Sequence, residues 1–284
     1  MKIGIFDSGL GGLLIAKAIR KMMPEYDYVY LGDTKRVPYG NRSHEAVFEF
    51  TKEAMNYLFK KENCAIIIIA CNTSSARALR RIQQEYLVDY NTTRKLMGES
   101  ERKILGVLIP TAEECAKYGR VGILGTSGTI SSNTFPKEIK KINRKTKVFQ
   151  NPAPMLVPLI EEGENTLANQ FIKKYLKPLL NKKLDAFALG CTHYPILKSQ
   201  IKKILPKNIK LISQDEIIPK KLKDYLSRHP EIEKRLEKTP NQSKARYRAG
   251  GKAKILVTDI TPNIIKLSNK WFGSKTRPKL VHLN

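Results

Sequence analysis

Short apolar runs alternate along the chain with segments whose apolar positions recur at helical spacing. Residues 2–6 and 26–33 have the pattern of short buried strands, and residues 64–70 form a continuous apolar run. Such a run is typical of a parallel strand buried on both faces. Residues 103–110 predict a further strand. Because helical segments separate these runs, the pattern predicts a doubly wound α/β fold.

The pattern starts again in the middle of the chain. The segment VGILGTSGTI (121–130) resembles IGIFDSGLGG (3–12), which lies 118 residues earlier. In the same way, the run that ends in Cys191 resembles the run that ends in Cys71, 120 residues earlier. Two landmarks with nearly equal offsets predict two similar α/β units.

The two matching cysteines both follow predicted buried strands. Cys71 and Cys191 each also precede a predicted helix, where free N–H groups and the helix dipole favour negative charge. Ligands of parallel α/β sheets bind beyond the carboxyl ends of the strands, and a thiol in such a place is favoured as thiolate. We therefore expect two reactive thiols at one ligand site.

Glycine-rich polar turns follow the first strand of each unit. The turns DSGLGG (7–12) and GTSGT (125–129) carry backbone donors and hydroxyls that suit a carboxylate or phosphate. Neither turn has the dinucleotide-binding or P-loop pattern. Two thiols that face one cleft suit a reaction in which one thiolate removes a proton from carbon and the opposite thiol gives a proton to the other face. That chemistry inverts a stereocentre without a cofactor.

The remaining cysteines, Cys64 and Cys115, are expected to be ordinary buried side chains. The chain has 4 cysteines. None forms a CxxC pair, so no zinc site is expected, and a cytosolic protein keeps such thiols reduced.

Charge is the strongest deviation in composition. The chain has 52 Lys and Arg against 26 Asp and Glu, a net charge of +26. This balance suits nucleic-acid binding, but the lysines are spread along predicted helices, which favours a generally basic surface. No apolar run is long enough for a membrane helix and the N-terminus lacks a signal-peptide pattern, so we expect a cytoplasmic protein.

Five motifs together resemble the glutamate racemases, members of the cofactor-independent aspartate/glutamate racemase superfamily. They are FDSGLGGL, YLGDTKRVPYG, ACNTSSA, LVPLIEEG and LGCTHYPIL, in the order and spacing of the family, and they cover roughly residues 3–205. The resemblance implies interconversion of L- and D-glutamate without a cofactor, to supply D-glutamate for peptidoglycan synthesis. It also implies a homodimer.

The resemblance also assigns the site residues. Cys71 and Cys191 are the two catalytic acid/bases, acting on the D- and L-isomer respectively. The other candidates are expected to bind substrate or to tune the thiols. Asp7 and Ser8 lie beside the substrate, Tyr39 and Gly40 hold its side-chain carboxylate, Asn72, Thr73 and Thr192 contact the groups on Cα, His193 and Asp7 also tune the thiols, and Glu161 and Thr126 are further candidate tuning residues.

The resemblance implies two α/β domains with the active site in the cleft between them. The C-terminal segment completes the first domain, so the expected limits are residues 1–97 plus 210–284 for the first and 98–209 for the second. Residues 239–254 lack acidic side chains and predict an exposed basic loop.

The C-terminal part departs from the family pattern. Ser213 stands after Ile212, where the family normally has an acidic residue. Two alternatives stay open: a related two-cysteine racemase for aspartate, and an additional nucleic-acid or DNA gyrase partner for the basic surface.

Overall fold

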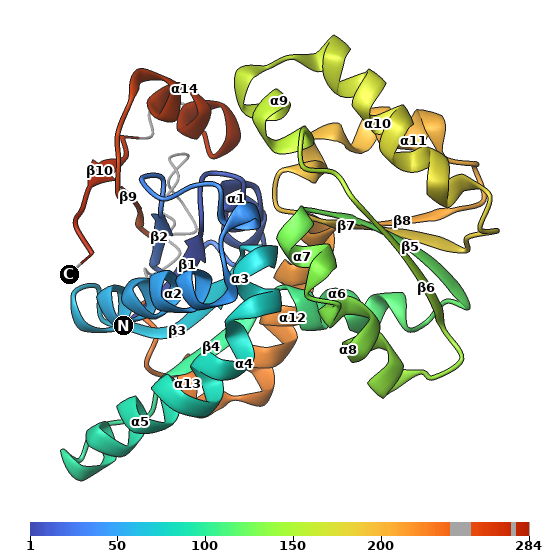
Figure 1. Ribbon diagram of the computed structural model, residues 1–284. Helices are drawn as coiled ribbons and strands as arrows, with labels where there is room; N and C mark the ends of the chain where they lie inside the picture. Colours follow the sequence, from blue (N-terminus) through green and yellow to red (C-terminus); the bar gives the residue numbers. More distant parts are fainter. Residues whose placement is uncertain (239–250, 274–276, 284) are drawn as a thin grey trace, which may run out of the picture.

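The computed structural model describes residues 1–238, 251–273 and 277–283. In this part of the chain two parallel sheets lie side by side, each covered by helices (Figure 1). The six-stranded sheet has the order β10-β9-β2-β1-β3-β4 and the four-stranded sheet has the order β6-β5-β7-β8. The strands are β1 (Lys2–Asp7), β2 (Tyr28–Gly32), β3 (Cys64–Ile69), β4 (Lys103–Gly106), β5 (Arg120–Gly125), β6 (Lys147–Pro152), β7 (Ala186–Gly190), β8 (Lys210–Ile212), β9 (Ala253–Val257) and β10 (Lys279–Leu280).

The two sheets repeat one arrangement. In the first, β1 lies between β2 and β3 with β4 beyond β3; in the second, β5 lies between β6 and β7 with β8 beyond β7. The predicted internal repeat is therefore confirmed at the level of strand order. Strands β9 and β10 extend the first sheet beyond β2.

The helices between β1 and β4, together with the helix between β9 and β10, are α1 (Gly12–Met22), the 3₁₀ turn η1 (Tyr39–Asn41), α2 (His44–Lys60), α3 (Asn72–Arg77), α4 (Leu79–Arg81), the π-helical turn η2 (Ile82–Tyr86), α5 (Leu87–Leu96) and α14 (Pro262–Trp271). The others are α6 (Leu108–Cys115), α7 (Ser127–Ser131), α8 (Thr134–Ile142), α9 (Leu156–Glu162), α10 (Asn165–Leu180), the 3₁₀ turn η3 (Tyr194–Leu197), α11 (Lys198–Ile204), α12 (Gln214–Arg228) and α13 (Pro230–Glu233).

Alternate residues of the central strands pack against opposite helical layers. Ile3 and Ile5 of β1 share a core with α1, whereas Phe6 packs in a second core with Val47 of α2. Every residue of β3 is buried, as the continuous apolar run predicts. Helices therefore cover both faces of the six-stranded sheet, so a ligand site is expected at the ends of its strands.

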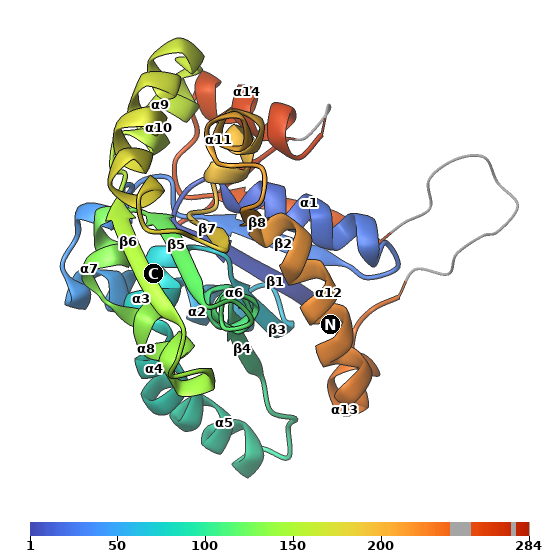
Figure 2. The same ribbon diagram turned by 90° about the vertical axis from the view of Figure 1, so that its right-hand side faces the viewer.

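The chain passes between the sheets through two helices. Helix α6 follows β4 and leads into β5, and α12 follows β8 and leads toward β9. Helices α6 and α12 pack against each other, and Figure 2 shows them next to each other.

The predicted domain limits differ from this division. Strand β4 pairs with β3, with Ile66 opposite Lys103, although residues 98–209 were expected in the second domain. Strand β8 pairs with β7, with Ala186 opposite Lys210, although residues from 210 onward were expected in the first. By sheet membership, the chain crosses over at 107–119 and again after 212.

Two local predictions need correction. The strand predicted over 103–110 ends at Gly106, and α6 begins at Leu108, because a short apolar run does not distinguish a buried strand from a buried helix. Of the basic loop predicted over 239–254, residues 239–250 lie outside the described residues, while Ala253 already belongs to β9. Within the described residues, no helix has the length and hydropathy to span a membrane.

Candidate active site

A cavity of about 340 Å³ opens between the two sheets at the carboxyl ends of their strands. Its wall includes Ser8 after β1, Cys71 after β3, Thr126 after β5 and Cys191 after β7. Because the two sheets have the same strand order, both cysteines occupy equivalent places. The expectation that the two thiols meet at one site agrees with this geometry.

Cys71 lies two residues after the end of the buried strand β3 and caps the N-terminus of α3. Its sulfur accepts a hydrogen bond from the Ser74 amide at 3.4 Å and lies 3.3 Å from the Ser8 hydroxyl. The side chain is 4% exposed. Burial and the nearby charge of Asp7 raise the pKa of Cys71, and the bonds from Ser8 and Ser74 offset this only in part. The protonated thiol is therefore favoured at neutral pH.

Asp7, at the end of β1, lies beneath the cavity rather than on its wall. Its carboxylate accepts hydrogen bonds from the Gly9 amide at 3.2 Å and the Gly12 amide at 3.1 Å. The Thr192 hydroxyl donates to its second oxygen at 3.5 Å. Burial raises the pKa of Asp7, although the charge of His193 and the two amides act in the opposite direction.

His193 stands between Cys191 and Glu161. Its Nδ1 atom lies 3.9 Å from Cys191 Sγ, and its Nε2 atom lies 2.9 Å from a carboxylate oxygen of Glu161. Burial lowers the pKa of His193, but the bonds to Cys191 and Glu161 outweigh burial and raise it to about 10. A protonated imidazole here stabilises negative charge that develops on the Cys191 sulfur.

Hydroxyl groups line the boundary between the two sheets. The Thr73 hydroxyl lies 3.0 Å from that of Thr126 and 3.4 Å from that of Thr129. Next along α3, the Arg77 guanidinium donates to the Gly128 carbonyl at 3.0 Å and to the Ser131 hydroxyl at 2.9 Å. Helices α3 and α7 are thus joined across the cleft beside Cys71.

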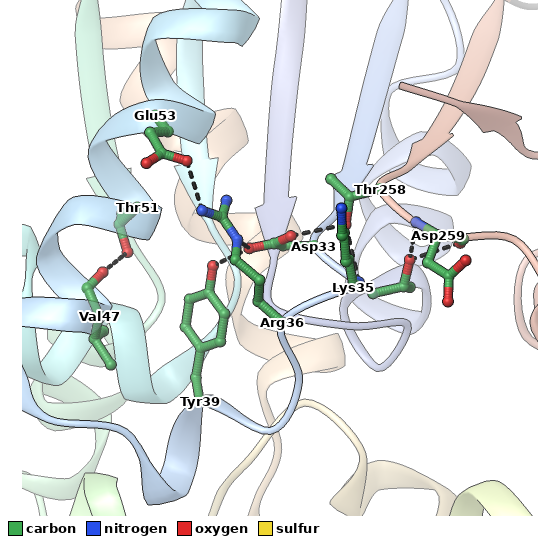
Figure 3. Close-up of polar contacts among 10 residues, drawn as sticks. Asp33, Lys35, Arg36, Tyr39, Val47, Thr51, Glu53, Thr258 and Asp259 are labelled. Atoms are coloured by element: carbon green, nitrogen blue, oxygen red, sulfur yellow. Dashed lines mark hydrogen bonds and ion pairs between the residues drawn. The ribbon is translucent and has the colours of Figure 1, made fainter. Parts of the chain in front are cut away.

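The loop that carries Tyr39 and Gly40 is held by a buried carboxylate, Asp33 (Figure 3). Asp33 accepts hydrogen bonds from the Tyr39 hydroxyl at 2.5 Å, from Arg36 at 2.6 Å and from Thr258 at 2.7 Å. The Tyr39 hydroxyl is therefore engaged inside the protein, and the backbone of Tyr39 and Gly40 remains for a ligand. Gly40 also lies close to Thr126, since an added Cβ would be 3.1 Å from the threonine Cβ.

Of the twelve predicted site residues, all except Asp7 line the cavity. They are Ser8, Tyr39, Gly40, Cys71, Asn72, Thr73, Thr126, Glu161, Cys191, Thr192 and His193. The other two cysteines, Cys64 and Cys115, are fully buried away from it, and burial raises the pKa of each to about 12. Among the residues that the structure describes, no group of three or more His, Cys, Asp or Glu side chains is placed to hold a metal ion.

Sequence reasoning missed three residues that support the site. Asp7 is the last residue of β1 and Asp33 comes directly after β2, so an acidic residue at a strand end was the available signal. Trp271 of α14 packs against His193, and Gln214 of α12 bonds to Asn72. Both approach from distant parts of the chain, and no local pattern marks them.

The fold and the paired thiols define a two-cysteine α/β racemase. A family model described as Asp/Glu/Hydantoin racemase matches residues 14–217, and the chain belongs to this family.

Individual relatives are similar over their whole length. A glutamate racemase of Sulfurihydrogenibium sp. is 35% identical over 99% of this chain and 97% of its own. A glutamate racemase of Persephonella marina is 36% identical over 100% of this chain and 98% of its own. The crystal structure of a glutamate racemase from Francisella tularensis in complex with D-glutamate superposes with a TM-score of 0.84 at 30% identity, covering 100% of this chain and 98% of that one.

Proposed function

We propose that this chain is a glutamate racemase that interconverts L- and D-glutamate by proton transfer between Cα and two cysteines. The observation that carries the proposal is the placement of Cys71 and Cys191 at equivalent strand ends of one cavity. Membership of the racemase family and full-length similarity to glutamate racemases support the choice of reaction and substrate.

In the direction from L- to D-glutamate, the Cys191 thiolate removes the proton from Cα. The electron pair of the C–H bond stays on the substrate as a short-lived carbanion. The Cys71 thiol then donates its proton to the opposite face, and the new C–H bond has the D configuration. Cys191 ends as a thiol and Cys71 as a thiolate, so the reverse reaction starts from the state that the forward reaction leaves.

The surroundings of the two thiols suit these starting states. The raised pKa of Cys71 keeps its proton available for donation. On the other side, His193 is held as a cation by Glu161 and lies 3.9 Å from Cys191 Sγ, where its charge faces the sulfur that exchanges a proton with Cα. Each face of the stereocentre therefore has its own positioned group for proton transfer.

Recognition of the substrate uses the polar ends of both sheets. The Tyr39 and Gly40 backbone holds the side-chain carboxylate, because the Tyr39 hydroxyl is engaged by Asp33. Asn72, Thr73 and Thr192 contact the groups on Cα, and Ser8 lies beside Cys71. We place the enzyme in the cytoplasm, where it supplies D-glutamate for peptidoglycan synthesis.

The test is racemisation in heavy water without added cofactor. When L-glutamate is converted and sampled early, new D-glutamate should carry deuterium at Cα, because the Cys71 thiol has exchanged with solvent. Unreacted L-glutamate should carry almost none, because its proton passes to Cys191. Replacement of either cysteine by Ala should abolish racemisation, while Cys64→Ala and Cys115→Ala should retain it.

Two outcomes would contradict the proposal. If the product kept its original hydrogen, a mechanism with two separate proton-transfer groups would be excluded. If Cys71→Ala or Cys191→Ala racemised glutamate at near the parental rate, the assignment of these two cysteines as the proton-transfer groups would be excluded. A parallel assay with aspartate tests the substrate: a higher kcat/KM for aspartate would overturn the choice of glutamate and leave the two-thiol mechanism standing.

A further inference from the structure

Asn72, the residue after Cys71, forms a reciprocal pair of hydrogen bonds with Gln214. Asn72 Nδ2 donates to Gln214 Oε1 at 2.8 Å, and Gln214 Nε2 donates to Asn72 Oδ1 at 2.8 Å. Asn72 is 3% exposed and Gln214 is fully buried. The nitrogen and the oxygen of each amide are therefore engaged in this pair.

The pair joins the two halves of the molecule. Asn72 begins α3, the helix that follows strand β3 of the six-stranded sheet, and Gln214 begins α12, the helix that follows strand β8 of the four-stranded sheet. A third residue, Thr111 of α6, accepts a hydrogen bond from Gln214 Nε2 at 3.1 Å. The chain crosses between the sheets through α6 and α12. Gln214 belongs to α12, and its side-chain amide is hydrogen-bonded to α6 through Thr111.

Thr111 sets the direction of all these bonds. Its hydroxyl donates to the Val107 carbonyl at 2.7 Å, so its oxygen is left to accept from an N–H group. The nitrogen end of the Gln214 amide must then face Thr111, and its oxygen must face the nitrogen of Asn72. One N–H group and one lone pair of Asn72 remain for other partners, and Asn72 lines the cavity.

We propose that Gln214 is a positioning residue that fixes the orientation of the Asn72 amide for substrate binding. This inference rests on the proposed function, in which Asn72 contacts the groups on Cα. Without Gln214 the Asn72 amide can rotate by a half turn and present its oxygen where the substrate carboxylate requires a donor. Gln214 follows Ser213, the position at which this chain departs from the family pattern.

The principal variant is Gln214→Met, which keeps the length of the side chain and removes both hydrogen-bonding atoms. We expect kcat/KM for glutamate to fall about tenfold, which is about 1.4 kcal/mol of transition-state stabilisation, with most of the change in KM. Gln83→Met is the matched control, because Gln83 donates to the Ile104 carbonyl at 2.8 Å and does not line the cavity. It should retain the parental constants.

A double-mutant cycle separates positioning from general loss of stability. In an Asn72→Ala background, Gln214→Met should change KM by less than about twofold, because the amide through which it acts is gone. Thr111→Val, which is nearly isosteric, should raise KM about two- to threefold, since Gln214 keeps its partner but loses the bond that orients it. If Gln214→Met does not fold, the KM of Thr111→Val still tests the positioning role of Gln214.

The outcomes are distinguishable. Parental KM in both Gln214→Met and Thr111→Val, or an equal loss with and without Asn72, would overturn the positioning role while wild-type racemisation upheld the proposed function. Absence of glutamate racemisation by the wild-type protein would overturn the proposed function itself. In that case the dissociation constant for D-glutamate, measured by calorimetry on the same variants, decides the role of Gln214.

Discussion

Trp271 stands edge-on to His193, with the ring centroids 5.5 Å apart and the ring planes at 87°. Trp271 ends α14, which belongs to the C-terminal segment, and packs against α1 of the first sheet. Figures 1 and 2 both show α14 beside α9, the helix that carries Glu161. The C-terminal helix therefore supports the histidine next to the second thiol.

Replacement of Trp271 by Leu should lower kcat about two- to tenfold, since aromatic pairs of this geometry contribute about 0.5–1.5 kcal/mol beyond their buried area. The loss of support should let the His193 ring move relative to Cys191. Initial rates in both directions measure the effect, and Phe272→Leu is the neighbouring control. Trp271 is also the chain's single tryptophan, so its emission should change on binding of D-glutamate. Parental kcat in Trp271→Leu would contradict the supporting role.

Asp7→Asn should make the protein more stable at neutral and alkaline pH and lower its activity. A carboxyl group whose pKa is raised on folding stabilises the fold fully below its unfolded pKa, and this contribution is lost as pH rises through the folded value. Burial raises the pKa of Asp7, so its ionised form weakens the parent at neutral and alkaline pH.

Asn keeps the shape without the charge. The melting temperature of Asp7→Asn should therefore exceed that of the parent at pH 8, with a smaller difference at acid pH, while kcat falls. Thermal melts across the pH range measure this. Asp224→Asn, at a surface ion pair with Arg228, should show no such trend. A variant less stable than the parent at pH 8 would refute the assigned cause.

Gly11→Ala should disable the site with little change to the fold. An added Cβ would lie 2.4 Å from His193 Nδ1 and 2.5 Å from Thr192 Oγ1, too close for either side chain to stay. We expect kcat/KM to fall at least about tenfold. Gly98→Ala should show the opposite pattern, because Gly98 has φ of 71° and open space around it. That variant should lose about 1 kcal/mol of stability and keep its activity. Similar kcat/KM for both variants would contradict the prediction.

Arg77→Ala should weaken closure of the cleft. The guanidinium joins α3 to Gly128 and Ser131 of α7, and hydrogen bonds of this kind at a half-exposed site contribute about 1 kcal/mol. We expect KM for glutamate to rise about fivefold, with a smaller change in kcat, and faster hydrogen exchange in α7. Arg228→Ala removes an exposed arginine far from the cavity wall and serves as the control. A change in kcat alone would point to a different role for Arg77.

The parts of the structure that follow from local pattern were predicted from sequence. The buried strands around residues 64–70 and 186–190, the internal repeat and the meeting of Cys71 with Cys191 at one site all depend on periodicity and on the rule for strand ends. Each of these features rests on a pattern within a short segment, so it can be recognised in the sequence alone.

The rest depends on contacts between distant residues. Gln214 reaches Asn72 across 142 positions, and Thr258 reaches Asp33 across 225. Trp271 meets His193 only because the C-terminal segment returns to the first sheet. The expected domain limits differ from sheet membership for the same reason: a strand's own residues do not say which sheet it joins, and β4 and β8 are short edge strands with little pattern.

The position of β9 has a consequence for the order in which the two halves can assemble during synthesis. Strands β5 to β8 are contiguous in the chain, so the four-stranded sheet can close as soon as residue 212 has left the ribosome. The six-stranded sheet must wait, because its strand β2 pairs with residues 253–257. Until then the newly made chain exposes one open edge at β2, and Asp33 lacks its bond from Thr258. The loop of Tyr39 and Gly40, made early, thus acquires its final support last.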